Sequence, residues 1–179
     1  MTLHHCLLRA VPVVFAAAMA AAPVLAAFDE DYDAKPWQEL AVELPPAPAM
    51  ANLLPFYVSP ATENRFYIDG ASLGAGSDGV IRYTMVVEAA GGARNVTYEG
   101  LRCSTRELRV YAFGQRDGSW SKSRSNDWRP VQDAAANRQH AVLMSEYFCP
   151  VEVGGNMTPE RIREALRRGG YSDTQRWYR

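Results

Sequence analysis

Two cysteines, Cys103 and Cys149, constrain the fold of this chain more than any other feature. The first closes a run with the alternation of a β-strand, and the second ends a run with helical spacing. A bond between them would tie a sheet to a helix and close a loop of about 47 residues, which the chain-entropy model values at roughly 4 kcal/mol. An even cysteine count in an exported chain favours pairing. The alternative is two buried free thiols.

The case for export comes from the first 26 residues. A short polar start ending at Arg9 precedes an apolar run over residues 10–22, which is too short to span a bilayer. Small residues around Ala26 suit a signal peptidase. We therefore expect residues 1–26 to be a cleavable signal peptide, which removes Cys6 and delivers the protein to the periplasm.

Removal of that leader leaves 179 − 26 = 153 residues, enough for one domain with a real core. Residues 27–52 form an acidic, proline-rich N-terminal arm, residues 53–152 the core domain, and residues 153–179 a basic C-terminal helix and tail. The prolines of residues 44–48 favour an extended connection. Trp37 offers the arm an aromatic side chain with which to dock on the core.

The core is expected to begin with an antiparallel meander of about five or six strands. Residues 80–89 alternate apolar and polar side chains most clearly, which is the period of a strand with one buried face. Along residues 94–103 the alternation shifts by one at Gly100, which indicates a β-bulge. Further strands are predicted at residues 65–69, 108–114 and 119–121.

Helical spacing replaces this alternation after Asp133. One helix is predicted from a cap at Asp133 to a stop at Pro150, and a second from Thr158, with Pro159 at its first position, to Gly169. Sheet first and helices after it gives an α+β fold.

Charge is distributed unevenly. In residues 27–43 six acids face Lys35, a net of −5, whereas in residues 102–129 seven bases face three acids, a net of +4. The basic segment could receive the acidic arm, bind an anionic envelope component such as a phosphate-bearing glycan, or remain solvated surface. The mature net charge, 18 − 20 = −2, argues against nucleic-acid binding. The candidate partner-binding face consists of Arg102, Arg106, Arg109, Trp120, Arg124 and Trp128.

No pattern in the sequence indicates a catalytic site, a cofactor or a metal. His140 is the only histidine left after the leader, and together with two cysteines it is one ligand short of a closed zinc site. Mid-helix, it is more typical of a surface or packed residue than of a general base. Two distant carboxylates can still converge without a signature, so a small envelope hydrolase remains the alternative.

Several segments carry a family resemblance. They are residues 28–32, 35–37, 53–57, 65–73, 78–80, 91–95, 99–103, 111–114 and 147–150. Through these segments the chain closely resembles the cryptic neisserial protein family of bacterial envelope proteins, which implies a periplasmic location in a Gram-negative bacterium and supplies no catalytic residues.

A second resemblance rests on spacing. The positions of Cys103, Cys149, Trp120 and Trp128 are similar to those of surface-adhesin E proteins. That likeness implies a non-catalytic binding module that forms a homodimer through an open sheet edge. We therefore expect a periplasmic binding or envelope-assembly module, with a hydrolase or an adhesin-like protein as alternatives.

Overall fold

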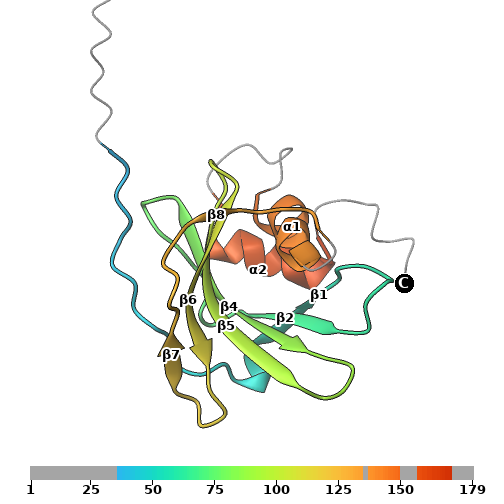
Figure 1. Ribbon diagram of the computed structural model, residues 1–179. Helices are drawn as coiled ribbons and strands as arrows, with labels where there is room; N and C mark the ends of the chain where they lie inside the picture. Colours follow the sequence, from blue (N-terminus) through green and yellow to red (C-terminus); the bar gives the residue numbers. More distant parts are fainter. Residues whose placement is uncertain (1–35, 135–136, 150–156, 171–179) are drawn as a thin grey trace, which may run out of the picture. The chain divides into compact units, whose positions relative to one another are not determined.

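The computed structural model describes residues 36–134, 137–149 and 157–170 (Figure 1). The predicted signal peptide, the start of the acidic arm and the C-terminal tail after Gly170 lie outside these residues. Trp37 and the described residues after it belong to one compact unit.

Eight strands of the described chain form one antiparallel sheet. They are β1 (Leu53–Phe56), β2 (Arg65–Asp69), β3 (Gly74–Ala75), β4 (Val80–Glu88), β5 (Arg94–Arg102), β6 (Glu107–Gly114), β7 (Trp120–Lys122) and β8 (Arg129–Pro130). The main path runs β1, β2, β4, β5, β6, β7, while β3 pairs with β4 and β8 pairs with β6. Most strands pair with a neighbour along the chain because the connections are short; β2 and β3 do not pair with each other, nor do β7 and β8.

The sheet has more strands than the five or six expected. The strands predicted from alternation are present as β2, β4, β5, β6 and β7. Three were missed: β3 and β8 have two residues each, too few to show a period, and β1 contains Pro55. A proline is tolerated there because β1 is an edge strand with only β2 as its partner.

The C-terminal part is helical, as expected, but its first helix differs from the prediction. It begins as α1 (Arg138–Val142) and continues as the π-helical turn η3 (Leu143–Phe148). Asn137, not Asp133, occupies the N-cap position of α1, so the predicted cap is wrong. Asp133 instead lies 3.7 Å from the Arg138 guanidinium as an ion pair.

The second helix, α2 (Pro159–Arg168), matches its prediction at both ends. The Thr158 hydroxyl accepts a hydrogen bond from the Arg161 amide, and Pro159 occupies the first helical position. Gly169 ends the helix with a φ of 86°, in the left-handed region that glycine adopts without strain. A short 3-10 turn, η1 (Met50–Asn52), precedes β1.

The main core lies between the sheet and these helices. Side chains of β4 alternate between the two faces of the sheet, so that Tyr83 points toward the helices and contacts Phe148, with ring centroids 4.9 Å apart. Further fully buried residues of this core come from both layers: Ile68, Leu101, Leu143, Met144, Tyr147 and Ile162.

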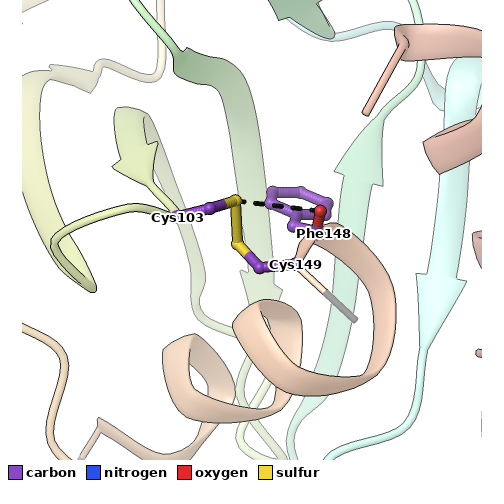
Figure 2. The surroundings of a disulfide bond; sticks show 3 residues. All are labelled: Cys103, Phe148 and Cys149. Carbon is purple, nitrogen blue, oxygen red and sulfur yellow. Dashed lines mark hydrogen bonds between the residues drawn. A yellow bond between two sulfur atoms is a disulfide. The ribbon is translucent and has the colours of Figure 1, made fainter. Parts of the chain in front are cut away.

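The expected disulfide joins these layers (Figure 2). Cys103 directly follows β5 and Cys149 directly follows η3, and their Cα atoms are 5.6 Å apart. The Cys103 sulfur also lies 3.9 Å from the carbonyl oxygen of Phe148. The bond therefore ties the end of a central strand to the end of a helix, as the sequence indicated.

Candidate functional site

The face of the sheet opposite the helices is covered by the end of the N-terminal arm. We call this face the outer face and the covering segment, residues 37–48, the strap. Figure 1 shows the strap, in blue to cyan, approaching the sheet beside β6 and β7. A second, smaller apolar cluster lies beneath it and combines Val42 and Leu44 of the strap with Tyr98, Tyr111, Ala112 and Trp120.

Glu39 anchors the strap. One carboxylate oxygen accepts a hydrogen bond of 2.6 Å from the Tyr111 hydroxyl and lies 3.5 Å from the Arg82 guanidinium. The other accepts hydrogen bonds from the Arg109 guanidinium and, at 3.3 Å, from the Trp128 indole. The Glu39 side chain is only 14% exposed. A single carboxylate is thus held by three hydrogen-bond donors, one of them charged, and by an ion pair with a second arginine.

Trp37 occupies an aromatic notch two residues before Glu39. The Arg102 guanidinium lies 4.0 Å from the centroid of the Trp37 ring and 5.2 Å from that of Trp128, which are cation–π distances. The two indoles meet edge to face at 6.0 Å. The Trp37 indole N–H also donates to the Asp78 carbonyl oxygen at 2.8 Å.

Asp78 and Arg82 hold the backbone of the strap at Leu40. The Leu40 amide donates to the Asp78 carboxylate at 2.9 Å, and the Arg82 guanidinium donates to the Leu40 carbonyl oxygen at 3.4 Å. Arg82 and Asp78 are also ion-paired at 2.6 Å. Burial raises the pKa of Asp78, but the hydrogen bond from Arg82 and those from backbone amides outweigh burial and hold the pKa below its usual value. Asp78 is therefore an anion at neutral pH.

A bulge in β6 places Tyr111 in this site. The pairing of β5 with β6 shifts register between Tyr98 and Glu99. The bulge expected in residues 94–103 at Gly100 is wrong, because the extra residue belongs to β6 and β5 pairs with β4 in unbroken register. Tyr111 is the extra residue, so Tyr111 and its neighbour Ala112 both pack on the outer face. Tyr111 lies directly over Gly100, where an added Cβ would come within 2.2 Å of its hydroxyl oxygen. Burial and the bond to Glu39 hold the pKa of Tyr111 well above its usual value, so the hydroxyl stays a donor.

The structure divides the six residues of the predicted face into two groups. Four of them contact the strap: Arg102, Arg109, Trp120 and Trp128. The contacts of three are given above, and the Trp120 indole donates to the Pro45 carbonyl oxygen at 2.7 Å. Arg102 is also ion-paired with Glu107. Arg106 and Arg124 are exposed. Part of the basic face thus receives the acidic arm, one of the three alternatives that the charge pattern left open.

A polar cluster that the sequence did not reveal lies on the helix side of the sheet. The Glu99 carboxylate accepts hydrogen bonds from Tyr83 at 2.8 Å and Thr97 at 2.7 Å, and lies 3.0 Å from Nε2 of His140 on α1. The only hint was an acid inside the apolar stretch of residues 96–103. With 1% of Glu99 exposed, a solute cannot contact this carboxylate, and the cluster acts as part of the core.

Opposing effects determine the pKa values of this pair. Burial raises the pKa of Glu99, but the charge and hydrogen bond of His140 outweigh burial, and the pKa lies below its usual value. Burial lowers the pKa of His140, and the charge of Glu99 likewise outweighs burial and raises it. Each shift favours the charged form of its group, so Glu99 and His140 form a buried ion pair.

A pocket of about 340 Å³ opens between the strap and the sheet. Val42 and Leu44 line its strap side, and Arg109, Tyr111 and Lys122 line its sheet side. The one carboxylate in its lining is Glu39, which is already engaged by arginines. Within the described residues, no group of three or more histidine, cysteine or acidic side chains is placed to hold a metal ion, and no helix is long and apolar enough to cross a membrane.

Comparison with known proteins adds a family. Neither the curated proteins nor the solved structures yield a significant match to this chain. The family model described as CNP1-like family matches residues 32–167, which include the strap, the whole sheet and nearly all of α2. The match spans well over half of the chain, and the protein therefore belongs to the CNP1-like family.

Proposed function

We propose that this protein is a non-enzymatic binding or assembly module of the bacterial cell envelope that binds an anionic envelope component through one edge of its sheet. The observation that carries this proposal is a row of exposed cations that form no ion pair with the strap. We call the row the basic edge; it consists of Arg106, Arg116, Lys122, Arg124 and Arg129.

The basic edge follows from the topology of the sheet. Both β7 and β8 pair with β6, so these short strands and the loops around them lie along that side of the sheet. All five cations are exposed, and no described carboxylate lies within 4.0 Å of any of them. Nearby Asp117 and Asp127 hydrogen-bond serine side chains instead. Five cations against two acids leave a net of +3, which attracts a polyanion.

The proposed location is the periplasm, after removal of residues 1–26. The apolar run of residues 10–22 and the small residues before the expected cleavage point support it. The resemblance to neisserial envelope proteins and to surface-adhesin E proteins supports a binding role in the same compartment. Cell fractionation followed by N-terminal sequencing tests the location. Recovery of the protein from the cytoplasmic fraction with Met1 still in place would contradict it.

Binding to purified lipopolysaccharide, which carries phosphate groups, tests the basic edge. The variant Arg106→Gln/Arg124→Gln/Arg129→Gln should bind about tenfold or more weakly than wild type in a co-sedimentation assay, because a cation near an anionic surface contributes about 1 kcal/mol. A matched control, Arg65→Gln/Arg167→Gln/Arg168→Gln, removes three exposed arginines elsewhere and should bind like wild type. Equal binding by both triple variants would refute a role for the basic edge.

A further inference from the structure

Glu39 is bound in the way that proteins bind a ligand's carboxylate. Its partners come from three separate parts of the fold. Arg109 and Tyr111 of β6 and Trp128 of the segment before β8 donate hydrogen bonds, and Arg82 of β4 adds an ion pair. Charge-assisted hydrogen bonds of this kind give both affinity and geometric specificity. The site is therefore formed by the body of the protein, and the strap only fills it.

The strap is attached to this site without any strand pairing. Residues 37–48 have no regular secondary structure, and the sheet's pairings begin only at β1. Trp37 and Leu40 remain 45% and 46% exposed although they flank the buried Glu39 carboxylate. Because no strand pairing holds the strap, it can separate from the sheet without breaking the sheet's own backbone hydrogen bonds, at a lower cost than global unfolding.

A site vacated by the strap favours another anion. Without Glu39, the three guanidinium groups of Arg82, Arg102 and Arg109 face only two carboxylates, those of Asp78 and Glu107, which leaves a net of +1. With the strap in place, the side chains of Arg82 and Arg109 are 11% and 21% exposed. When the strap leaves, these cations face solvent, and a carboxylate that replaces Glu39 restores the contacts that Glu39 made with them. The vacated site therefore favours an anionic group.

We propose that the outer face is a recognition site for an extended segment of a partner protein that carries a tryptophan two residues before a glutamate, and that the strap is its built-in occupant. The strap shows how such a segment fits: the aromatic ring enters the notch at Arg102 and Trp128, and the carboxylate enters the pocket two residues later. Asp78 and Arg82 bind the backbone of the next residue, which any sequence offers. This site is distinct from the basic edge and goes beyond the function proposed for it.

Peptide binding to the full mature chain tests this proposal. The probe is a fluorescein-labelled peptide with the sequence of residues 36–46, read by fluorescence anisotropy. The wild-type site is filled by its own strap, whose effective concentration is in the millimolar range because it is tethered. The variant Trp37→Ala/Glu39→Gln weakens that competitor and should bind the peptide about tenfold or more tightly than wild type does.

A control peptide with glutamine in place of Glu39 should lose binding to the same variant by about tenfold or more, because it lacks the charge that the arginines require. Failure of the variant to bind the first peptide, or equal binding of both peptides, would overturn the proposal. Unchanged near-ultraviolet circular dichroism verifies the fold. If the double variant does not fold, Glu39→Gln alone, which leaves every wall of the site intact, takes its place.

Two further measurements separate the alternatives. The basic-edge triple variant, combined with Trp37→Ala/Glu39→Gln, should still bind the peptide, so the two proposals can fail independently. Analytical ultracentrifugation of the wild-type protein shows whether a second copy of this chain occupies the site. A dimer that disappears in the Trp37→Ala/Glu39→Gln variant would mean that it does. That result would contradict the proposal that the partner is a different protein.

Discussion

Two glutamates, Glu39 and Glu99, each accept a hydrogen bond from a tyrosine, yet they lie on opposite faces of the same sheet. Glu39 reaches the outer face from an irregular segment and binds Tyr111. Glu99 belongs to β5 itself and binds Tyr83 in the core. The first carboxylate belongs to a segment without strand pairing, whereas the second belongs to a central strand of the sheet. The same chemical group therefore serves docking in one place and core stability in the other.

Gly100 is predicted to be essential for docking of the strap. In Gly100→Ala the new Cβ meets the ring and hydroxyl of Tyr111, with contacts from 2.2 to 2.9 Å, and displaces the donor that holds Glu39. We expect a loss of about 1 to 3 kcal/mol in the free energy of unfolding, measured by urea denaturation. Gly74→Ala is the control, since its Cβ meets nothing within 4 Å and its change should stay within about 0.5 kcal/mol. Equal effects of both substitutions would contradict the packing described for Tyr111.

Stability should depend on pH through Glu99 and His140. The raised pKa of His140 means that its contribution is complete below the usual value of 6.5 and is lost as the pH rises through the higher folded value. The lowered pKa of Glu99 means that its contribution is present above the usual value of 4.5 and is lost as the pH falls through the lower folded value. The pair therefore stabilises the fold most between these two values.

Urea denaturation of wild type and His140→Gln measures this effect. Wild type should be less stable at about pH 8.5 than at about pH 5.5, and the variant should lose most of that difference. His140 is the only histidine in the chain after His5, so a lost dependence in this range identifies it. An unchanged pH profile in the variant would show that His140 does not carry the effect.

Among the elements, α2 is held in place by one arginine as well as by its buried apolar residues Ile162, Ala165 and Leu166. Arg163 donates to the Gly70 carbonyl oxygen at 2.8 Å and to the Leu73 carbonyl oxygen at 3.3 Å, both in the connection between β2 and β3. Arg163→Ala should lower the free energy of unfolding by about 1.5 to 3 kcal/mol, because two backbone acceptors lose a charged donor.

Arg167→Ala removes the same side chain one turn along the same helix, where 59% of it is exposed and Glu164, at 4.0 Å, forms an ion pair with it. Its effect should stay within about 0.5 kcal/mol. Thermal denaturation of both variants makes the comparison. A similar shift for the two would mean that the Arg163 contacts contribute little to docking of α2.

The elements also mark how far the sequence can predict this fold. The sequence predicted β4 correctly because its alternation runs over nine residues. It predicted α2 correctly because Thr158 marks the start of the helix and Gly169 marks its end. The two-residue strand β3 has no period to detect. The cap at Asp133 was wrong because a favourable capping residue does not decide where the helix begins.

Within the candidate site, the sequence predicted opposite charges on the arm and the basic segment and left their pairing as one of three alternatives, without showing which residues pair. Glu39 is one of six acids in residues 27–43, and only the three-dimensional fold brings it beside Arg109, seventy residues later. The cluster around Glu99 was beyond prediction for the same reason, since His140 comes from a different element. Long-range pairs of this kind leave no local pattern in a sequence.

For the molecule as a whole, the disulfide is predicted to be the largest single contribution to stability that one reagent can remove. It joins residues 46 apart, and the chain-entropy model values such a loop at about 4 kcal/mol. Reduction should therefore lower the urea midpoint of the wild-type protein markedly. The same reductant should leave Cys103→Ala/Cys149→Ala unchanged, and intact mass should show two alkylated cysteines only after reduction. Alkylation without reductant would contradict the bond.

The distances along the chain between Glu39 and its donors also set an order of events. A polypeptide emerges from its N-terminus, so Glu39 is made before any of its partners, and the last of them, Trp128, follows 89 residues later. Contacts between residues so far apart in sequence form slowly because a long loop must close first. We therefore expect docking of the strap to be a late step of folding. The contact between Trp37 and Trp128 would then form only after most of the sheet is complete.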